Sequence, residues 1–359
     1  MINSVKKFKK RGAFVRIAAV LICVSAMMTV FSSCAGKAYE YDLAEYIVPG
    51  DYSVIEITPE AVHKRTEEIK NTLLKNNAIV PPAENAVSIS GRVLKKGDVA
   101  VVSYQCYLES EVGKETAVPL MEDKECHIVL GNGKYFEEIE NALTGYNMGA
   151  KAPINVPVTV PTDFSLGILK GKSVVFVITV NSAYELKLPV YNDEFIASVT
   201  HYSTVTEYEK ALHVQVREQL VWEALLEKTK VTTYPMDEVS DHTLDFIEQY
   251  TSYATSAGVT LEQYVARKFF MDLADFHLKA DEYAKRLTKE EMLVYQIARL
   301  NGLELTDEEY EAGAVKYAAI YRLSGRNELV SVYGETIVRY TVLKDKVLSF
   351  VYSQSASNG

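Results

Sequence analysis

The sequence predicts an α+β protein in which an antiparallel sheet wraps around a short helix and joins a helical region. Residues 93–187 contain short runs rich in Val, Ile and Tyr that alternate in polarity, a pattern typical of strands. From about residue 191 onward, apolar residues instead recur at helical spacing. Residues 1–33 differ from both regions, because they combine basic and apolar residues with no acid. These changes predict a signal segment at 1–33, a tether and linker helix at 34–92, the sheet domain at 93–187 and a helical domain at 188–359.

The N-terminal segment has the parts of a secretory signal. Six basic residues precede the apolar stretch "IAAVLICVSAMMTVF", which is short for a membrane span, and Ser-Ser-Cys34 follows. Those last residues resemble a lipobox, whose cysteine receives lipid and becomes the new N-terminus, although Phe31 stands where Leu is usual. We expect a lipoprotein that is anchored through Cys34 at the extracytoplasmic face of the cell membrane. Ordinary cleavage nearby and an uncleaved anchor are the alternatives.

The charge balance argues against a nucleic-acid partner, because the net charge is −10. Loss of residues 1–33 would leave 48 acidic side chains against 32 basic ones (38 less six), a net charge of −16. Cys23 would leave with the signal, so Cys106 and Cys126 would be the thiols that remain. A disulfide between these two is possible outside the cytoplasm.

The elements of the first half follow from local pattern. "TPEAVHKRTEEIKNTLLKNNAIV" (58–80) predicts a helix that Thr58 caps, after a short extended piece, "DYSVIEI" (51–57). Strands are expected at "DVAVVSYQCYL", "CHIVL", "INVPVTV" and "SVVFVITVNSAYEL". A short helix, "KYFEEIENALTGY", lies between the second and third strands, with Phe136, Ile139 and Leu143 on one face.

The second half predicts a series of capped helices. Thr206 with Glu209 and Thr306 with Glu309 have the spacing of capping boxes, and Thr260 with Gln263 opens another helix. Pro235 marks the start of another helix that stops at Gly258, and a long helix ends near Asn301. "SVYGETIVRYTVLKDKVLSFVYS" is expected to form one final helix.

The glycine-rich stretch "LGNGKYFEEIENALTGYNMGAK" (130–151) invites comparison with a phosphate-binding loop. A Walker loop requires a hydroxyl residue after its lysine, but Tyr135 follows Lys134 here. A dinucleotide site requires a parallel βαβ unit, which this pattern does not predict. The six histidines show no metal-ligand spacing. We therefore expect a tight turn that precedes a helix, with no metal and no cofactor.

The same stretch resembles the strand-turn-helix of FKBP-type peptidyl-prolyl isomerases, in the version that trigger factor carries. "ILKGKSVVFVITVNSAYELKLPVYNDEF" (168–195) is similar to the junction between the isomerase and chaperone domains of trigger factor. "ITPEAVHKRTEEIKNTLL" resembles the helix that precedes the isomerase domain. The resemblance covers about 57–355 and implies an FKBP-like sheet wrapped on a short helix, joined to an all-α chaperone domain with extended arms. The ribosome-binding domain of trigger factor has no counterpart in the matched residues.

The resemblance also implies site residues, which would form an aromatic hollow for proline. The residues in catalytic positions are Tyr104, Phe136, Ile139, Phe164 and Phe176, and those expected to bind substrate are Tyr135, Cys126 and Ile128. Phe136 would also offer its backbone N–H to the substrate carbonyl. Ile139 and Cys126 replace aromatic residues of the family, and the acid of an early loop has no clear match. Spacing alone would equally suit residues that only pack in the core.

Three functions remain open at this point. The first is an extracytoplasmic folding factor, an isomerase and chaperone whose partners are unfolded or nascent secreted polypeptides with proline-containing segments, and not the ribosome. The second is a holdase lipoprotein with a degenerate isomerase domain that only binds unfolded chains. The third is an adhesion or assembly lipoprotein that reuses the scaffold.

Overall fold

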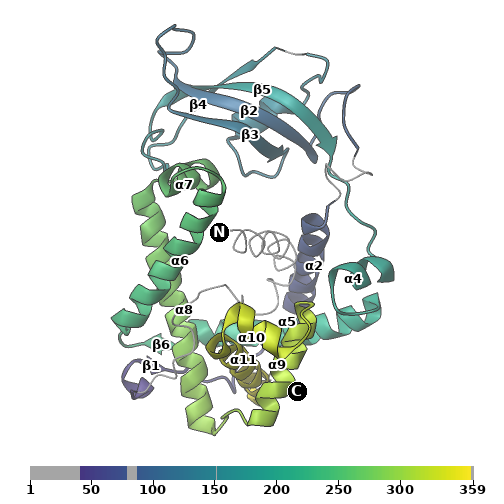
Figure 1. Ribbon diagram of the computed structural model, residues 1–359, viewed down its shortest axis with the longest axis vertical. Coiled ribbons are helices and arrows are strands. Elements are labelled where there is room, and N and C mark those ends of the chain that lie inside the picture. Colours follow the sequence, from purple (N-terminus) through teal and green to yellow (C-terminus); the bar gives the residue numbers. More distant parts are fainter. Residues whose placement is uncertain (1–40, 79–86, 151, 357–359) are drawn as a thin grey trace. The chain divides into compact units, whose positions relative to one another are not determined.

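The computed structural model describes residues 41–78, 87–150 and 152–356, which contacts divide into two compact units (Figure 1). Unit 1 comprises 41–76, 190–249 and 279–356, and unit 2 comprises the described residues between 77 and 189 together with 250–278. The predicted signal segment and the lipidation residue Cys34 lie outside the described residues. Unit 2 includes 29 residues, 250–278, that the prediction assigns to the helical domain.

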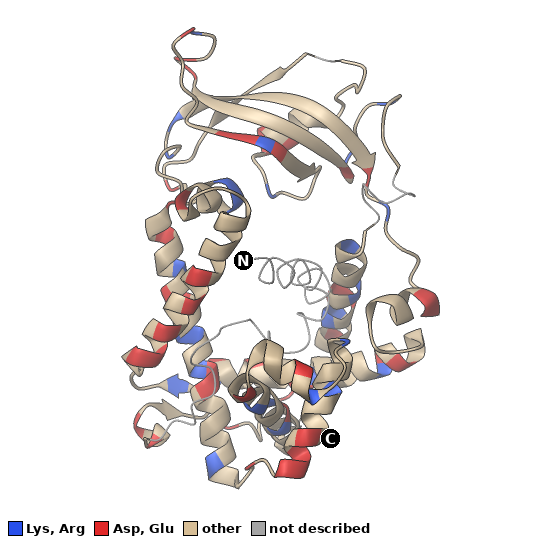
Figure 2. Cartoon of the chain, viewed as in Figure 1, with Lys and Arg blue, Asp and Glu red and all other residues tan. Residues whose placement is uncertain are grey.

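The sheet of unit 2 is antiparallel, in the order β3-β2-β5-β4. Its strands are β2 (Asp98–Leu108), β3 (Met121–Val129), β4 (Ile154–Thr159) and β5 (Ser173–Glu185). β2 and β4 match the prediction closely, whereas β3 begins five residues before the predicted "CHIVL". The added residues, "MEDKE", are mostly charged and lie on an edge strand, where charge protects an exposed strand from mispairing (Figure 2). Their polarity hid the strand from a search for apolar alternation.

A single apolar core joins the sheet to the short helix α3 (Glu137–Leu143). Alternate residues of β2, namely Ala100, Val102, Tyr104 and Cys106, are buried in this core, as a period of two requires. Cys126 pairs across the ladder with Val102, whereas Cys106 pairs with Met121. The two cysteines are therefore not neighbours, and both are free thiols.

Helices dominate unit 1. In chain order the helices that lie wholly or partly in it are α2 (Pro59–Asn76), α4 (Asp193–Val199), α5 (Val205–Lys228), α6 (Met236–Ser256), α8 (Leu273–Asn301), α9 (Asp307–Ile320), α10 (Arg326–Tyr333) and α11 (Glu335–Gln354). The C-terminal part of α6, all of α7 (Leu261–Phe269) and the first residues of α8 belong to unit 2. None of the helices in the described ranges has both the length and the apolar character needed to cross a bilayer.

The predicted tether is wrong for residues 43–55. A 3-10 turn (Leu43–Glu45) leads into β1 (Ile47–Val48), which pairs with β6 (Lys230–Val231). Leu43, Ile47 and Ile55 are buried in a core that α5, α8 and α11 complete. Each such burial contributes roughly 1.5–3 kcal/mol, enough to hold the segment in place.

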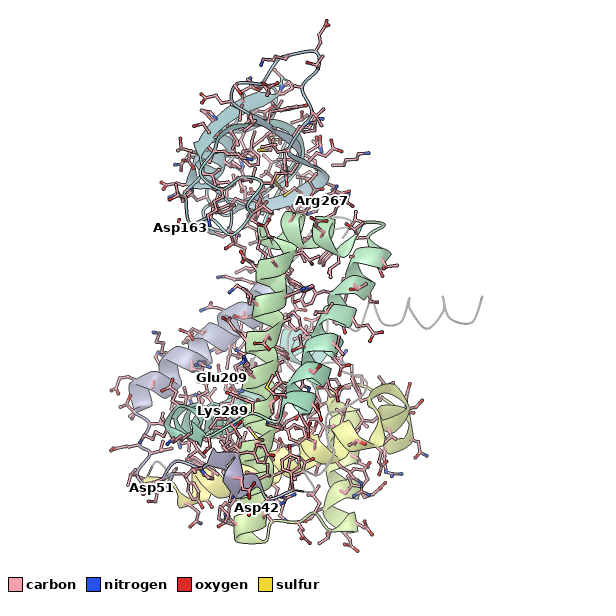
Figure 3. The ribbon with its side chains drawn as sticks, turned by 90° about the vertical axis from the view of Figure 1, so that its left-hand side faces the viewer. Asp42, Asp51, Asp163, Glu209, Arg267 and Lys289 are labelled. Atoms are coloured by element: carbon pink, nitrogen blue, oxygen red, sulfur yellow. The ribbon has the colours of Figure 1, made fainter. Side chains whose placement is uncertain are left out.

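Two further predictions in the helical region need correction. The cap of α5 is Thr204, whose hydroxyl accepts from the Glu207 N–H at 3.2 Å, so the predicted pair of Thr206 and Glu209 is displaced by two residues. Glu209, which Figure 3 labels, instead pairs with Lys70 of α2 at 2.7 Å. The final helix is two helices, α10 and α11, because Gly334 between them adopts a positive φ of 88°. The capping box at Thr306 is confirmed, and the helix start predicted at Thr260 also forms one.

Candidate functional site

The eight residues predicted for the site come together in unit 2, in or against its apolar core. Phe136 precedes α3, and its ring centroid lies 5.8 Å from that of Phe176 on β5 and 5.2 Å from that of Phe164. Tyr104 of β2 completes the group, with its ring 5.6 Å from Phe176. We call the rings of Tyr104, Tyr135, Phe136, Phe164 and Phe176 the aromatic cluster.

Burial divides the predicted residues into a floor and a rim. The floor is almost fully buried and consists of Tyr104, Cys126, Ile128, Ile139 and Phe176. The rim consists of Tyr135, Phe136 and Phe164, which are only partly buried. A peptide that approached the cluster would therefore meet the rim first.

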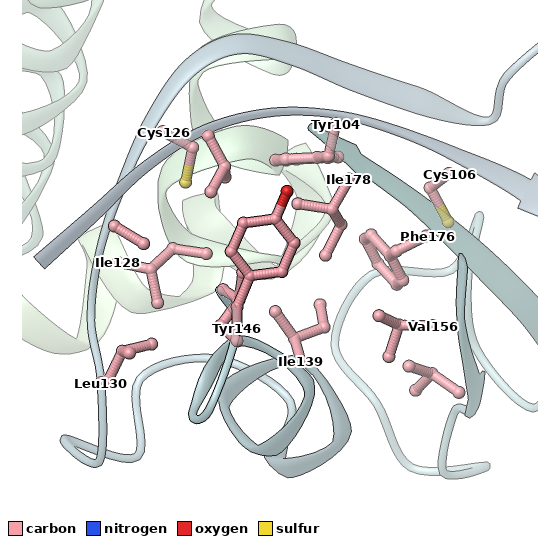
Figure 4. Packing of buried hydrophobic residues seen from close by; sticks show 14 of the residues in the cluster. Tyr104, Cys106, Cys126, Ile128, Leu130, Ile139, Tyr146, Val156, Phe176 and Ile178 are labelled. Atoms are coloured by element: carbon pink, nitrogen blue, oxygen red, sulfur yellow. The ribbon is translucent and has the colours of Figure 1, made fainter. Parts of the chain in front are cut away.

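Ile139 occupies a floor position where the resemblance implies an aromatic ring. It is 3% exposed and packs within the core. Figure 4 shows the ring of Tyr146, which sequence reasoning missed, standing close to Ile139 and pointing toward Tyr104 and Ile178. The Tyr146 hydroxyl donates a hydrogen bond to the carbonyl of Ala150, which gives this buried polar group a partner. An aromatic ring thus lies beside Ile139, although another position of the chain supplies it.

Cys126 and Tyr135 link the floor to the rim. The Cys126 Sγ and the Tyr135 hydroxyl lie 3.1 Å apart. Burial raises the pKa of the Cys126 thiol, and burial together with the thiol raises the pKa of the Tyr135 phenol. Both groups are therefore neutral at physiological pH. Neither one is an activated nucleophile, which would require a lowered pKa.

The glycine turn binds an internal carboxylate. The Glu140 carboxylate accepts hydrogen bonds from the N–H groups of Gly131 at 2.8 Å, Gly133 at 3.3 Å and Tyr135 at 3.2 Å. Glu140 is only 6% exposed, and the positive φ angles of Gly131 and Gly133 turn their N–H groups toward it. The Glu140 carboxylate thus occupies the N–H groups that a nucleotide phosphate would need, which argues against a nucleotide-binding loop.

Glu140 was not among the predicted site residues, although the sequence contains a signal for it. It falls one turn from Phe136 on the apolar face of the predicted helix, unlike the neighbouring acids Glu137 and Glu138, which are exposed. An acid on a buried face requires hydrogen-bond donors, and the glycine turn nine residues earlier supplies them. Glu140 fixes the backbone that carries Tyr135 and Phe136.

The backbone at Phe136 is arranged to receive a hydrogen-bond acceptor. Phe136 is the N-cap residue of α3, and its carbonyl accepts from the N–H groups of Ile139 and Glu140. Its own N–H has no acceptor among the described residues. N–H groups at the start of a helix generally lack an intrahelical partner and bind acceptors from outside.

Phe270, which sequence reasoning assigned to the helical region, also contacts the rim. It follows α7, and its ring lies 5.9 Å from that of Tyr135 and 6.2 Å from that of Phe136. Next to it, the Asp272 N–H donates to the Ser165 carbonyl at 3.1 Å, and the Gly167 N–H donates to the Asp272 carboxylate at 2.8 Å. The expected open hollow is therefore covered by another part of the chain. A contact across more than a hundred residues leaves no local signal in the sequence.

Two family models match separate parts of the chain. Residues 91–181 match the FKBP-type peptidyl-prolyl cis-trans isomerase, and residues 198–353 match the C-terminus of bacterial trigger factor. These two parts of the chain are therefore similar to an FKBP-type domain and to the trigger factor C-terminal region. All eight predicted site residues lie within the FKBP-type match, whereas Phe270 and Asp272 lie within the trigger factor C-terminal match.

Curated relatives extend the likeness over most of the chain. The trigger factor of Caldicellulosiruptor saccharolyticus is 23% identical over 337 residues, which cover 89% of this chain and 74% of the relative. That of Thermoanaerobacter sp. (strain X514) is 24% identical over 331 residues, covering 85% and 71%. A solved structure of the trigger factor chaperone is 19% identical and covers 86% of this chain and 72% of its own, with a TM-score of 0.31. The coverage by the curated relatives means that the likeness to trigger factor extends over both matched parts of the chain.

Proposed function

We propose that the protein is an extracytoplasmic folding factor, a peptidyl-prolyl cis-trans isomerase and chaperone for secreted polypeptides. The proposed isomerase activity rests on the placement of Phe136. Its ring lies in the aromatic cluster, and its N–H has no acceptor among the described residues. A peptide carbonyl could accept from this N–H while the proline ring packs against the rim. The FKBP-type match over 91–181 supports the same assignment.

Prolyl isomerisation needs no acid, base or nucleophile from this site. Resonance holds the amide planar and creates a barrier of about 18–20 kcal/mol to rotation. A dry aromatic environment favours the twisted amide, which is less polar, over the planar one, and this difference in binding lowers the barrier. The hydrogen bond from Phe136 would hold the substrate carbonyl while the prolyl bond turns.

An isomerisation assay with a proline-containing peptide tests the catalytic part. Phe136→Ala removes the ring that contacts both Phe164 and Phe176, so we expect kcat/KM to fall at least tenfold. Val118→Ala is the matched control, because Val118 is 79% exposed in the same domain. Equal rates for Phe136→Ala and the wild type would contradict the assignment of Phe136.

A non-catalytic holdase is the second candidate, and one observation favours it. Ile139 stands where the family's pocket has an aromatic floor, and the neighbouring ring of Tyr146 is only 9% exposed, so the site offers less aromatic surface to a proline ring. A wild-type protein that suppresses aggregation of an unfolded client, yet leaves the rate of prolyl isomerisation at its uncatalysed value, would establish the holdase and exclude the isomerase.

The chaperone part rests on the trigger factor C-terminal match and on exposed apolar side chains. Met236 and Leu244 of α6 are each 60% exposed, and such groups can bind the apolar segments of unfolded chains. Replacing both with Ser should weaken the suppression of aggregation at least twofold. Replacing two exposed acids of the same helix, Asp237 with Asn and Glu248 with Gln, is the control and should leave suppression unchanged.

Export and lipid anchoring at Cys34 are supported by the sequence pattern of residues 1–34. Two acyl chains provide the stable attachment that one chain does not. Mass spectrometry of the N-terminus extracted from membranes should find a lipid-modified Cys34, and Cys34→Ala should release the protein from the membrane. An intact Met1, or a soluble chain without lipid, would refute the anchor.

A further inference from the structure

The turn between α7 and α8, residues 269–272, is seated on the rim of the aromatic cluster. Phe270 places its ring against Tyr135 and Phe136, the two rim residues whose backbone Glu140 and the start of α3 hold in place. Ala266 of α7 packs against the same core. All of these residues belong to unit 2, so this contact is internal to one compact unit.

We propose that Phe270 is an internal ligand of the rim, and that the rim is a binding site for an aromatic side chain of an unfolded client, which must displace Phe270. This inference rests on the proposed function, because it concerns the same site. It adds the kind of client side chain that the rim binds and the segment of the chain, the turn with Phe270, that competes with the client for the rim. Phe136 is itself a rim residue, and the Phe270 ring lies 6.2 Å from its ring, so a client side chain that packs on Phe136 competes with Phe270 for the same ring contact.

The backbone of Phe270 shows that the contact offsets a conformational cost. Phe270 has φ 50° and ψ 45°, the left-handed conformation that residues with a Cβ disfavour. This position after a helix is usually taken by glycine. The segment keeps a phenylalanine there and turns its ring onto the rim. Displacement of the ring would allow the backbone to leave this conformation. The unfavourable backbone conformation of Phe270 therefore weakens its competition with a client side chain for the rim.

Two hydrogen bonds hold the turn in register. Asp272 donates its N–H to the Ser165 carbonyl and accepts the Gly167 N–H at its carboxylate. A Cβ at Gly167 would lie 2.6 Å from the Asp272 Oδ2, so any side chain at this position would push the carboxylate away. Gly167 has no positive φ that a substitution would strain. The contact can therefore be weakened from either side, at Phe270 or at Gly167.

The rim contact is also of a kind that a client can replace. Phe270 and both of its ring partners are only partly buried, and Asp272 with Gly167 forms an exposed hydrogen bond. Edge-to-face ring contacts and exposed hydrogen bonds are individually modest. An aromatic side chain from an unfolded segment could make the same ring contacts with Tyr135 and Phe136.

Binding of a labelled peptide to the full chain tests the inference. The probe is an unstructured, fluorescein-labelled peptide that contains Ala-Phe-Pro, and its affinity is measured by fluorescence anisotropy. Phe270→Ala and Gly167→Ala should each bind it 5- to 10-fold more tightly than the wild type. Glu262→Ala, which removes an exposed side chain from the first turn of α7, is the matched control and should bind it with wild-type affinity. A probe with Ala in place of Phe should lose this gain.

Hydrogen–deuterium exchange provides the second readout and checks that the variants fold. A saturating amount of probe should speed exchange in residues 270–278 of the wild type, while β2 and β5 stay protected in every protein. Two variants that bind the probe no more tightly than the wild type, or a probe that leaves exchange in 270–278 unchanged, would overturn the inference. This result differs from failure of the proposed isomerase, because neither readout depends on catalysis.

Discussion

The aromatic cluster of unit 2 and the helix interfaces of unit 1 are held together by different chemistry. The aromatic cluster of unit 2 consists of neutral rings, and its rim is covered by a turn that a few modest contacts retain. The helix interfaces of unit 1 contain paired charged groups. Lys344 of α11 lies 2.6 Å from Glu290 of α8, which also accepts a hydrogen bond from the Trp222 indole of α5. Neutral ring contacts can be exchanged for those of a ligand, whereas a buried charge cannot lose its partner without a large cost.

The His242 and Glu291 pair extends this contrast. The imidazole of His242 on α6 lies 3.0 Å from the Glu291 carboxylate on α8, and the side chains are 1% and 3% exposed. These contacts fix α6 and α8 against each other in the part of unit 1 to which both contribute. The difference implies that mutations in unit 1 act on stability and that mutations at the rim act on binding.

Loss of the Glu290 carboxylate should produce the largest effect. Glu290→Ala leaves the Lys344 ammonium, only 10% exposed, without its ion-pair partner. Breaking a buried pair in this way costs about 3–5 kcal/mol. Urea denaturation followed by the fluorescence of Trp222, the chain's single tryptophan, would measure the loss for unit 1. The control is Glu311→Ala, whose exposed pair with Arg326 should contribute less than about 1 kcal/mol. Similar losses in the two variants would remove the contrast between the units.

Glu140→Ala should have the next largest effect, this time in unit 2. It leaves the N–H groups of Gly131, Gly133 and Tyr135 without their acceptor, which we expect to cost about 2–3 kcal/mol. Because the same turn carries the rim, affinity for a proline peptide should fall as well. Hydrogen–deuterium exchange should speed up in residues 131–136 but not in unit 1. Glu137→Ala, an exposed acid of the same helix, is the control, and an equal effect there would contradict the role of Glu140.

The pH dependence of stability should differ between the units. Burial alone would lower the pKa of His242, but the hydrogen bond and charge of Glu291, with Asp245 and Asp241 nearby, raise it above its usual value. The stabilisation is therefore complete below the pKa of an unfolded histidine, about 6.5, and is lost as pH rises through the folded pKa. Each tenfold gain in proton affinity corresponds to about 1.4 kcal/mol.

Denaturation at pH 6 and pH 9 with Trp222 fluorescence measures this loss. The wild type should be less stable at pH 9, whereas His242→Gln should show little change between the two values, whatever its absolute stability. Parallel behaviour of the two proteins would show that another group is responsible. The rings of the aromatic cluster should add no corresponding decline between these two pH values, because an unfolded tyrosine titrates only near pH 10 and burial raises the pKa values of Tyr104 and Tyr135 above that.

The sequence predicted what depends on local pattern and on family motifs. β2 and β4, the capping boxes at Thr260 and Thr306 and the membership of the aromatic cluster could all be read from spacing or resemblance. The division of the last helix was missed although Gly334 marks it, because one glycine inside an apolar helical pattern is often tolerated. The burial of Leu43 and the contact of Phe270 with the rim depend on residues far apart in the sequence, which no local pattern encodes.

The smallest expected effects come from the two capping boxes. One lies in each unit, so the same substitution can be compared in both. Thr306→Ala and Thr260→Ala each remove an oxygen that accepts the N–H of the third helical residue, a loss of about 1 kcal/mol. In unit 1, α9 packs against α10 and α11, and we expect Thr306→Ala to appear as reduced stability in the Trp222 signal. In unit 2, α7 carries Phe270 to the rim, so a frayed α7 should loosen that contact and tighten binding of the proline peptide about twofold. A Thr260→Ala variant that lowers the Trp222 transition as much as Thr306→Ala, and leaves peptide affinity unchanged, would show that α7 serves stability rather than access to the rim.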